Sequence, residues 1–169
     1  MLGASRLDTT NTWLQLHGSV RARLDAQLQP PLGWYTIWPL IAFVDDTTRH
    51  YFNLKTNGWE LGKKDNDHPP AEELHEFLAT GSSPSVVGQW NTIEWWVMKD
   101  TDSTNLRIRV DVNDMTVVEM VDNQPWQRNG TTGMGASSFF LNAAKRVSLY
   151  NEGSQVSWDD VFISEATTE

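Results

Sequence analysis

The stretch that decides the fold is Val20-Arg21-Ala22-Arg23-Leu24-Asp25-Ala26-Gln27-Leu28-Gln29. Apolar residues stand at every even position, and charged or polar residues stand between them. A period of two is typical of a β-strand that buries one face and exposes the other. Pro30-Pro31-Leu32-Gly33 then interrupts the pattern. We therefore predict a strand over residues 20–29 with one face in a core.

Much of the remaining chain repeats this pattern between turn-forming residues. Turns are indicated at Asp45-Asp46, at Asn113-Asp114 and at Asn57-Gly58, a dipeptide typical of hairpins. Further strands are predicted over residues 34–44, 49–54, 59–63, 90–98, 106–112, 115–121, 138–141, 146–150 and 156–164. Short strands at such regular spacing predict an all-β protein built as an antiparallel β-sandwich.

One segment departs from the strand pattern. After Pro69-Pro70, the residues Leu74, Phe77 and Leu78 fall on one helical stripe, and Gly81 follows. We therefore predict one short surface helix over residues 71–78.

Size and charge limit the class of protein. A chain of 169 residues with 39% hydrophobic and 21% charged residues fits one domain over residues 1–169. A formal net charge of -9 opposes charge-driven binding to nucleic acid or anionic lipid. We therefore expect no nucleic-acid partner. No stretch approaches the ~20 apolar residues that a bilayer-spanning helix needs, so we also expect no membrane insertion.

The absence of cysteine excludes disulfides, thiolate metal sites and a cysteine nucleophile. The first residues lack the charged and then apolar run of a signal peptide. The protein therefore either stays inside the cell or is a mature or excised domain. We expect the second alternative, at an extracellular or cell-surface location and as part of a larger multidomain protein.

The order of the segments resembles that of concanavalin A-like lectin and glucanase domains over residues 16–164. In the first half, the resemblance rests on Gly18-Ser19-Val20-Arg21-Ala22-Arg23-Leu24, Arg49-His50-Tyr51-Phe52-Asn53-Leu54 and Trp59-Glu60-Leu61-Gly62-Lys63. In the second half, it rests on Gln89-Trp90-Asn91-Thr92-Ile93-Glu94-Trp95, Leu106–Asp114, Gly133-Met134-Gly135-Ala136 and Val156–Ile163. The resemblance implies a jelly-roll sandwich and a polysaccharide or other glycan as partner, because that group contains glycan-binding modules, laminarinase-type glycosidases, alginate-type lyases and keto-disaccharide hydrolases.

The resemblance does not supply a catalytic set. Laminarinase-type enzymes carry carboxylates that alternate along one strand, whereas Glu94 is alone on its strand. Alginate-type lyases use an Arg-rich strand, a Gln-x-His strand and a late Tyr. Arg21 and Arg23 are similar to the first and Tyr150 to the third, but His17 lies on the wrong side of the arginines. No catalytic residue is assigned.

Tryptophan is unusually frequent, with nine residues in the chain. A sandwich core cannot easily bury them all, and flat aromatic rings pack well against the C–H faces of sugars. For each candidate, packing in the core is an equal alternative. Trp90, Trp95 and Trp158 are assigned to the core, because the resemblance expects buried residues there. The candidate sugar platforms are Trp34 and Trp38 on one strand face, together with Trp59, Trp96 and Trp126.

Two Arg-x-Arg pairs supply the polar candidates. The planar guanidinium group suits carboxylates and sugar hydroxyls, so outward-facing pairs could form a local basic patch for uronic acids. The alternative is an ordinary solvated strand face on which Asp25 and Asp111 pair with the arginines. The candidate ligand-binding residues are Arg21, Arg23, Arg107 and Arg109.

A structural calcium ion is implied by the resemblance to laminarinase-type domains, which place a carboxylate at the start of the last strand. Asp159 in Trp158-Asp159-Asp160-Val161 occupies the similar position. Carboxylate oxygen is a ligand that calcium prefers. The alternative is that Asp159 and Asp160 end in solvent.

Three functions remain open. The first is a carbohydrate-binding module that recognises a polysaccharide through exposed Trp and Arg on one sheet face, without catalysis. The second is a polysaccharide lyase or glycoside hydrolase of the same fold. The third is a structural or adhesive domain of a larger surface or viral assembly, in which the aromatic surface meets protein.

Overall fold

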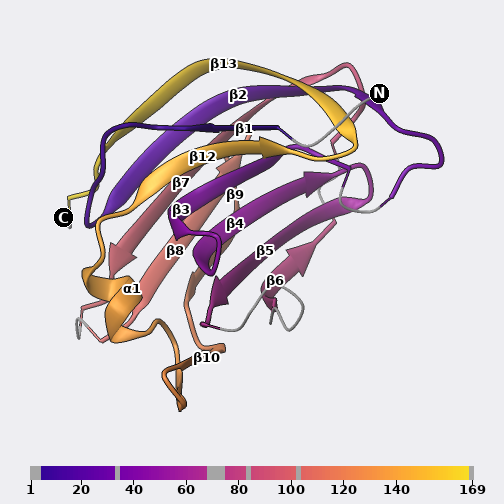
Figure 1. The fold of residues 1–169 in the computed structure, drawn as a ribbon. Helices are drawn as coiled ribbons and strands as arrows, with labels where there is room; N and C mark the ends of the chain where they lie inside the picture. Colours follow the sequence, from indigo (N-terminus) through magenta and orange to yellow (C-terminus); the bar gives the residue numbers. More distant parts are fainter. Residues whose placement is uncertain (1–4, 33–34, 68–74, 83–84, 102–103, 168–169) are drawn as a thin grey trace.

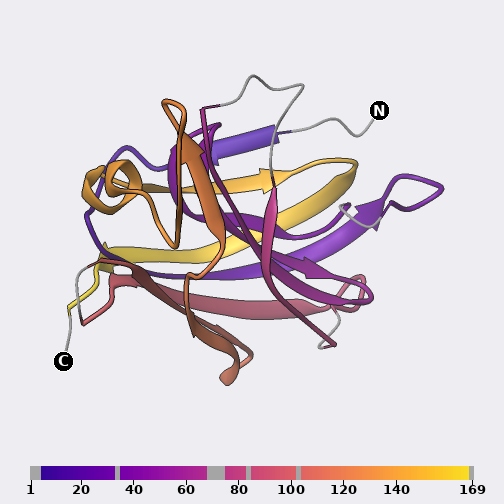
Figure 2. The ribbon, with the colours of Figure 1, turned by 90° about the horizontal axis from the view of Figure 1, so that it is seen from below.

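The computed structural model describes residues 5–32, 35–67, 75–82, 85–101 and 104–167. Two large antiparallel sheets pack face to face, with the six-stranded sheet in front of the five-stranded sheet in Figure 1. Figure 2 shows the same two layers from below. The structure confirms the predicted class, an antiparallel jelly-roll sandwich of the concanavalin A-like type.

The six-stranded sheet contains, in spatial order, β1 (Ser5–Asp8), β12 (Arg146–Asn151), β3 (Trp38–Asp45), β4 (Thr48–Lys55), β5 (Gly58–Asp65) and β6 (Glu76–Gly81). The five-stranded sheet contains β13 (Ser154–Glu165), β2 (Leu16–Gln27), β7 (Trp90–Lys99), β8 (Leu106–Val112) and β9 (Met115–Val121). The hairpin of β10 (Pro125–Arg128) and β11 (Thr131–Met134) and the helix α1 (Ser138–Asn142) lie at one end of the sandwich (Figure 1).

The core lies between the two sheets and follows the alternation seen in the sequence. Along β2, Val20, Ala22 and Leu24 have no exposed surface, while the residues between them are half-buried. Trp95 of β7 is also fully buried and lies against Gly18. A Cβ atom on Gly18 would come within 2.4 Å of the Trp95 ring, so glycine is the residue that lets β2 pass this indole.

The turn residues act as expected. Asn57-Gly58 closes the β4–β5 hairpin, in which Lys55 pairs with Gly58. Asn113 and Asp114 join β8 to β9 with φ values of 52° and 63°. Two successive left-handed residues are typical of the type I′ turn that matches the twist of paired strands.

Two predicted elements are wrong. The helix expected over residues 71–78 is contradicted in its described part, because Glu76–Gly81 forms the edge strand β6 by pairing with β5. Residues 71–74 of that expectation lie outside the described residues. The strand expected over residues 138–141 is the helix α1, because the Ser137 hydroxyl caps it by accepting a hydrogen bond from the Phe140 backbone N–H. Among the described residues, no helix is long and apolar enough to cross a membrane.

A buried ionic network fastens the segment after β9 to the inner face of the six-stranded sheet. The Lys63 ammonium group lies 3.0 Å from both carboxylate oxygens of Asp122 and 2.7 and 2.8 Å from the carbonyl oxygens of Gln124 and Gly135. His50 Nε2 lies 3.0 Å from the same carboxylate. The side chains of Lys63, Asp122 and His50 are completely buried.

Burial alone raises the pKa of Asp122, but the hydrogen bond and charge of His50 and the charge of Lys63 together hold it below its usual value. The ionised carboxylate is therefore the favoured form. Lys63 thus supplies the cation of a cage built from carboxylate and carbonyl oxygens.

Candidate functional site

The candidate site is the outer face of the five-stranded sheet, which points away from the core. Alternation along β2, β7 and β8 places the charged and aromatic residues of these strands on that face. In the register of the sheet, Trp96 lies between His17 of β2 and Arg109 of β8, and Trp90 lies opposite Arg23. Five predicted residues share this face: Arg21, Arg23, Trp96, Arg107 and Arg109.

Trp96 is held between two planar groups. The imidazole of His17 stacks on the indole, with ring centroids 4.8 Å apart and planes 6° apart. The guanidinium carbon of Arg109 lies 4.9 Å from the indole centroid. Because His17 and Arg109 come from the strands on either side of β7, they cover opposite faces of the ring. Trp96 therefore offers an edge to solvent, not the open stacking face expected of a sugar platform.

His17 also contacts Glu94, which precedes Trp96 by two residues on the same strand. His17 Nε2 lies 2.8 Å from Glu94 Oε1. The two side chains keep 25% and 35% of their surface exposed, so the pair is open to solvent. The third residue considered for an enzyme, Tyr150, lies in the other sheet on β12. The structure therefore separates Tyr150 from the pair of His17 and Glu94.

A cleft of about 770 Å³ opens beside this cluster. It runs along the ends of β7, β8 and β13. Its wall combines an indole, an imidazole, two guanidinium groups, hydroxyls and carboxylates. The lining residues are His17, Trp96, Met98, Lys99, Asp100, Thr101, Arg107, Arg109, Glu119, Ser164, Glu165, Ala166 and Thr167.

The arginines of this face are already paired with carboxylates. Arg109 donates to both oxygens of Asp111, at 2.9 and 2.6 Å. Arg23 Nε lies 2.5 Å from Asp25 Oδ1. These are the ion pairs that the sequence left open as the alternative to a basic patch. Elsewhere on the face, Arg21 pairs with Asp160 at 3.0 Å and Arg107 with Glu119 at 3.2 Å.

The pairing shifts the ionisation of the partners. The hydrogen bonds from Arg109 hold the pKa of Asp111 below its usual value, against the opposing effect of burial. Burial tends to raise the pKa of Asp25, but hydrogen bonds from Ser157 and Arg23 outweigh it and lower the pKa. Both carboxylates are therefore ionised near neutral pH, and both bind their arginines as charged groups.

Trp90 belongs to this face, although the sequence assigned it to the core. It is half-buried, and the guanidinium carbons of Arg21 and Arg23 lie 5.0 and 4.8 Å from its ring. Its position follows from strand parity, because it shares alternation with Glu94 and Trp96 and not with the buried Trp95. Two of the core assignments agree with the structure: Trp95 is fully buried and Trp158 packs against the core.

The other predicted platforms lie elsewhere. Trp38 packs edge-on against Tyr51 and Tyr150, in a separate cluster on the outer side of the six-stranded sheet. Trp126 lies on the β10–β11 hairpin, against Gly133. Trp34 lies outside the described residues.

Trp59 lies in the main core, although the sequence considered it as a sugar platform. It is 7% exposed and packs against Phe52, with ring centroids 5.9 Å apart. A ring without an open face cannot stack on a sugar, so this position corresponds to the core-packing alternative.

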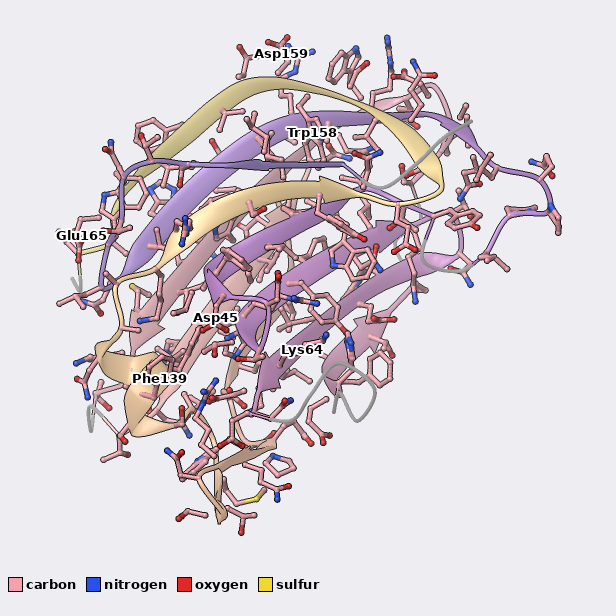
Figure 3. All side chains as sticks on the ribbon, in the orientation of Figure 1. Asp45, Lys64, Phe139, Trp158, Asp159 and Glu165 are labelled. Atoms are coloured by element: carbon pink, nitrogen blue, oxygen red, sulfur yellow. The ribbon has the colours of Figure 1, made fainter. Side chains whose placement is uncertain are left out.

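Asp159 lies on β13, at the top of the molecule in Figure 3, where a β-bulge interrupts the pairing with β2. Its side chain is 56% exposed and lies 3.7 Å from the guanidinium group of Arg21. In the described part of the chain, no group of three or more His, Cys, Asp or Glu side chains could hold a metal ion. Calcium binding at Asp159, with backbone carbonyls as further ligands, stays a prediction from the sequence.

Comparison with known proteins gives likeness in structure alone. No family model and no curated protein matches the sequence. The carbohydrate binding module CBM66 from Bacillus subtilis is similar with a TM-score of 0.62 and 10% identity, over 98% of this chain and 84% of that one. The alginate lyase A1-II′, a member of polysaccharide lyase family 7, has a TM-score of 0.54 and 11% identity, over 97% and 72%. An alginate lyase from Pseudomonas aeruginosa has a TM-score of 0.52 and 12% identity, over 96% and 74%. These likenesses support the jelly-roll fold.

Proposed function

We propose that this protein binds a polysaccharide at the outer face of the five-stranded sheet, in the cleft beside Trp96. The observation that carries the proposal is the wall of that cleft, where Trp96, His17, Arg107 and Arg109 meet. Indole and imidazole edges can contact the C–H surface of a sugar, and guanidinium and carboxylate groups can bind its hydroxyls. A cleft of about 770 Å³ is in the size range of ligand sites.

The similar solved structures support a polysaccharide as the partner. They comprise a carbohydrate binding module and two alginate lyases, so binding and processing of polysaccharides both occur in proteins of this fold. A polysaccharide partner also favours the extracellular or cell-surface location expected from the sequence. Because identity is low, the choice between binding and catalysis rests on the residues of this chain.

The second candidate function is a polysaccharide lyase or glycoside hydrolase. The observation that favours it is the 2.8 Å contact between His17 and Glu94 beside the cleft. A carboxylate that holds an imidazole is an arrangement that can orient a general base. In this alternative, His17 takes a proton from the substrate or from water, and Glu94 positions the ring.

The test combines binding and product release with one purified protein. Affinity gels that contain neutral polysaccharides or polyuronates report retardation, and assays for reducing or unsaturated ends report cleavage. We expect retardation without new ends, and we expect Trp96→Ala to abolish it. The matched control is Trp38→Ala, which removes an indole from the opposite side of the sandwich.

Each outcome decides between functions. New ends that disappear in His17→Ala would establish the enzyme. Retardation that depends on Trp38 and not on Trp96 would move the binding site to the six-stranded sheet. Neither retardation nor new ends would overturn both sugar functions and favour the structural or adhesive domain.

A further inference from the structure

We propose that the cleft accepts an uncharged segment of polysaccharide and rejects uronic acid. This inference rests on the proposed function, because it names the class of glycan that the same site takes. It is carried by the ion pairs of the outer face and by the charge balance of the cleft. It also separates this protein from the alginate lyases that share its fold.

The guanidinium group of Arg109 is engaged on two sides. Arg109 binds both oxygens of Asp111, whose side chain is only 10% exposed, and lies over the ring of Trp96. A bidentate pair of this kind is among the stronger polar contacts in proteins. Asp111 uses only part of the five N–H groups of Arg109, so a uronate carboxylate would either share the charge of Arg109 with Asp111 or displace Asp111 and leave a buried carboxylate without its partner. Sharing puts two carboxylates beside one cation, and displacement breaks a buried pair, so Arg109 is a poor receptor for a second carboxylate.

The second guanidinium group of the cleft is also shared. Arg107 lies 3.2 Å from Glu119 and 3.5 Å from Asp100, and both of these carboxylates line the cleft. A carboxylate that entered here would lie close to two others of the same charge. Like charges a few ångströms apart repel even in solvent, because salt at 0.1 M screens only charges that are more than roughly 10 Å apart.

The cleft as a whole carries no excess of positive charge. Its three basic residues, Lys99, Arg107 and Arg109, are balanced by three acidic residues, Asp100, Glu119 and Glu165. Figure 3 shows Glu165 near the end of β13. The wider face adds two arginines, Arg21 and Arg23, but more carboxylates, at Asp25, Glu94, Asp111, Asp159 and Asp160. A polyanion would therefore approach a surface of its own sign, on a protein of net charge -9.

Neutral sugars meet none of these costs. A hydroxyl group can donate a hydrogen bond to a carboxylate oxygen that already accepts one from arginine, because each oxygen has two lone pairs. Glu119, Asp100 and Glu165 are placed on the wall of the cleft to accept such bonds. The same ion pairs that exclude a uronate thus hold the acceptors in position for hydroxyls.

The experiment compares neutral with carboxylate-bearing polymers, first on one cellulose backbone and then on several. Wild-type protein is tested in affinity gels with hydroxyethyl cellulose and carboxymethyl cellulose, and then with laminarin, levan and galactomannan beside alginate and polygalacturonate. We expect neutral polymers to bind at least about tenfold more tightly than the uronates, with little dependence on salt. The double variant Asp111→Asn, Glu119→Gln removes the carboxylate partner of Arg109 and leaves Arg107 with Asp100 alone, so it should gain salt-sensitive binding to the uronates.

The outcomes separate this inference from the function on which it rests. Salt-sensitive wild-type binding to uronates in preference to every neutral polymer would overturn the inference and leave polysaccharide binding intact. Retardation by no polymer would overturn the proposed function and the inference together. If the double variant loses stability, Glu119→Gln alone tests the same gain, because Glu119 is exposed at 48% and lies at the surface of β9.

Discussion

The imidazole of His17 lies parallel to the indole of Trp96, with the ring centroids 4.8 Å apart. This stack joins two strands of the five-stranded sheet and fixes the ring that forms the wall of the cleft. The strand predicted over residues 20–29 did not include His17, whereas the observed strand β2 begins four residues earlier, at Leu16. The geometry gives His17 a positioning role if the cleft binds without catalysis.

That role can be tested with two substitutions. His17→Ala removes the ring that covers one face of Trp96 and should weaken polysaccharide binding by about 0.5–1.5 kcal/mol, the usual contribution of an aromatic pair. His17→Phe keeps the stack and removes the contact with Glu94, so its affinity should stay near that of the wild type. Equilibrium binding measurements check both. Equal loss in the two variants would contradict a role based on stacking and indicate that the imidazole nitrogen is needed.

Trp59 should matter for stability and not for binding. Its ring is 7% exposed and lies in the main core, so Trp59→Ala leaves a large cavity. We expect a loss of about 3–5 kcal/mol in the free energy of unfolding, measured by urea denaturation. The affinity of the folded fraction should not change. A variant of normal stability that no longer binds would show that Trp59 contacts the ligand after all.

Lys63 should be essential for folding stability. Lys63→Met leaves the buried carboxylate of Asp122 without its ammonium partner, and loss of one member of a buried ion pair costs about 3–5 kcal/mol. The control is Lys55→Met, which removes a pair with Glu60 at 2.8 Å that is partly exposed and should cost about 1 kcal/mol or less. Denaturation of the two variants side by side measures the difference. Similar losses in both would show that the buried network contributes no special stability.

Stability should rise in mildly alkaline solution because of Lys145. Burial, and then the charge of Lys99, lower the pKa of Lys145 to about 8 from a usual value of 10.5. Between these two values the unfolded chain keeps a proton that the folded chain has released, so the free energy of unfolding increases with pH. The gain is at most about 3 kcal/mol.

The check for this prediction is thermal denaturation from pH 7 to pH 10. Lys145→Met should lack the rise, while the titration of other lysines and tyrosines affects both proteins alike. A wild-type midpoint that only falls with pH, in parallel with the variant, would contradict the lowered pKa.

Period-two segments were the predictable part of the fold. The predicted bounds of the strands over residues 106–112 and 115–121 agree with β8 and β9, since clear alternation and the Asn113-Asp114 turn define them locally. The strands β1, β6, β10 and β11 were not predicted. They have four to six residues each and exist through pairing with neighbours, which local sequence does not report.

The candidate site was predictable only in part. Strand parity places Arg21 with Arg23 and Arg107 with Arg109, and it also places Trp90 with Glu94 and Trp96 on one face. Which residues of different strands meet depends on sheet register, as in the contact between His17 and Glu94, which are 77 residues apart. Strand alternation over residues 90–98 is enough to place Trp90 outside the core. The cover of Trp96 by His17 and Arg109 depends on sheet register, which the sequence does not report.

The ammonium group of Lys63 occupies a nest of oxygens that another protein could fill with a metal ion. A metal ion is drawn from solution, so chelators or dilution can remove it, and its occupancy follows its concentration. The ammonium group of Lys63 belongs to the chain, so every protein molecule carries it. The contact that holds the segment from Asp122 to Gly135 is therefore encoded in the sequence and does not depend on the concentration of metal ions in solution.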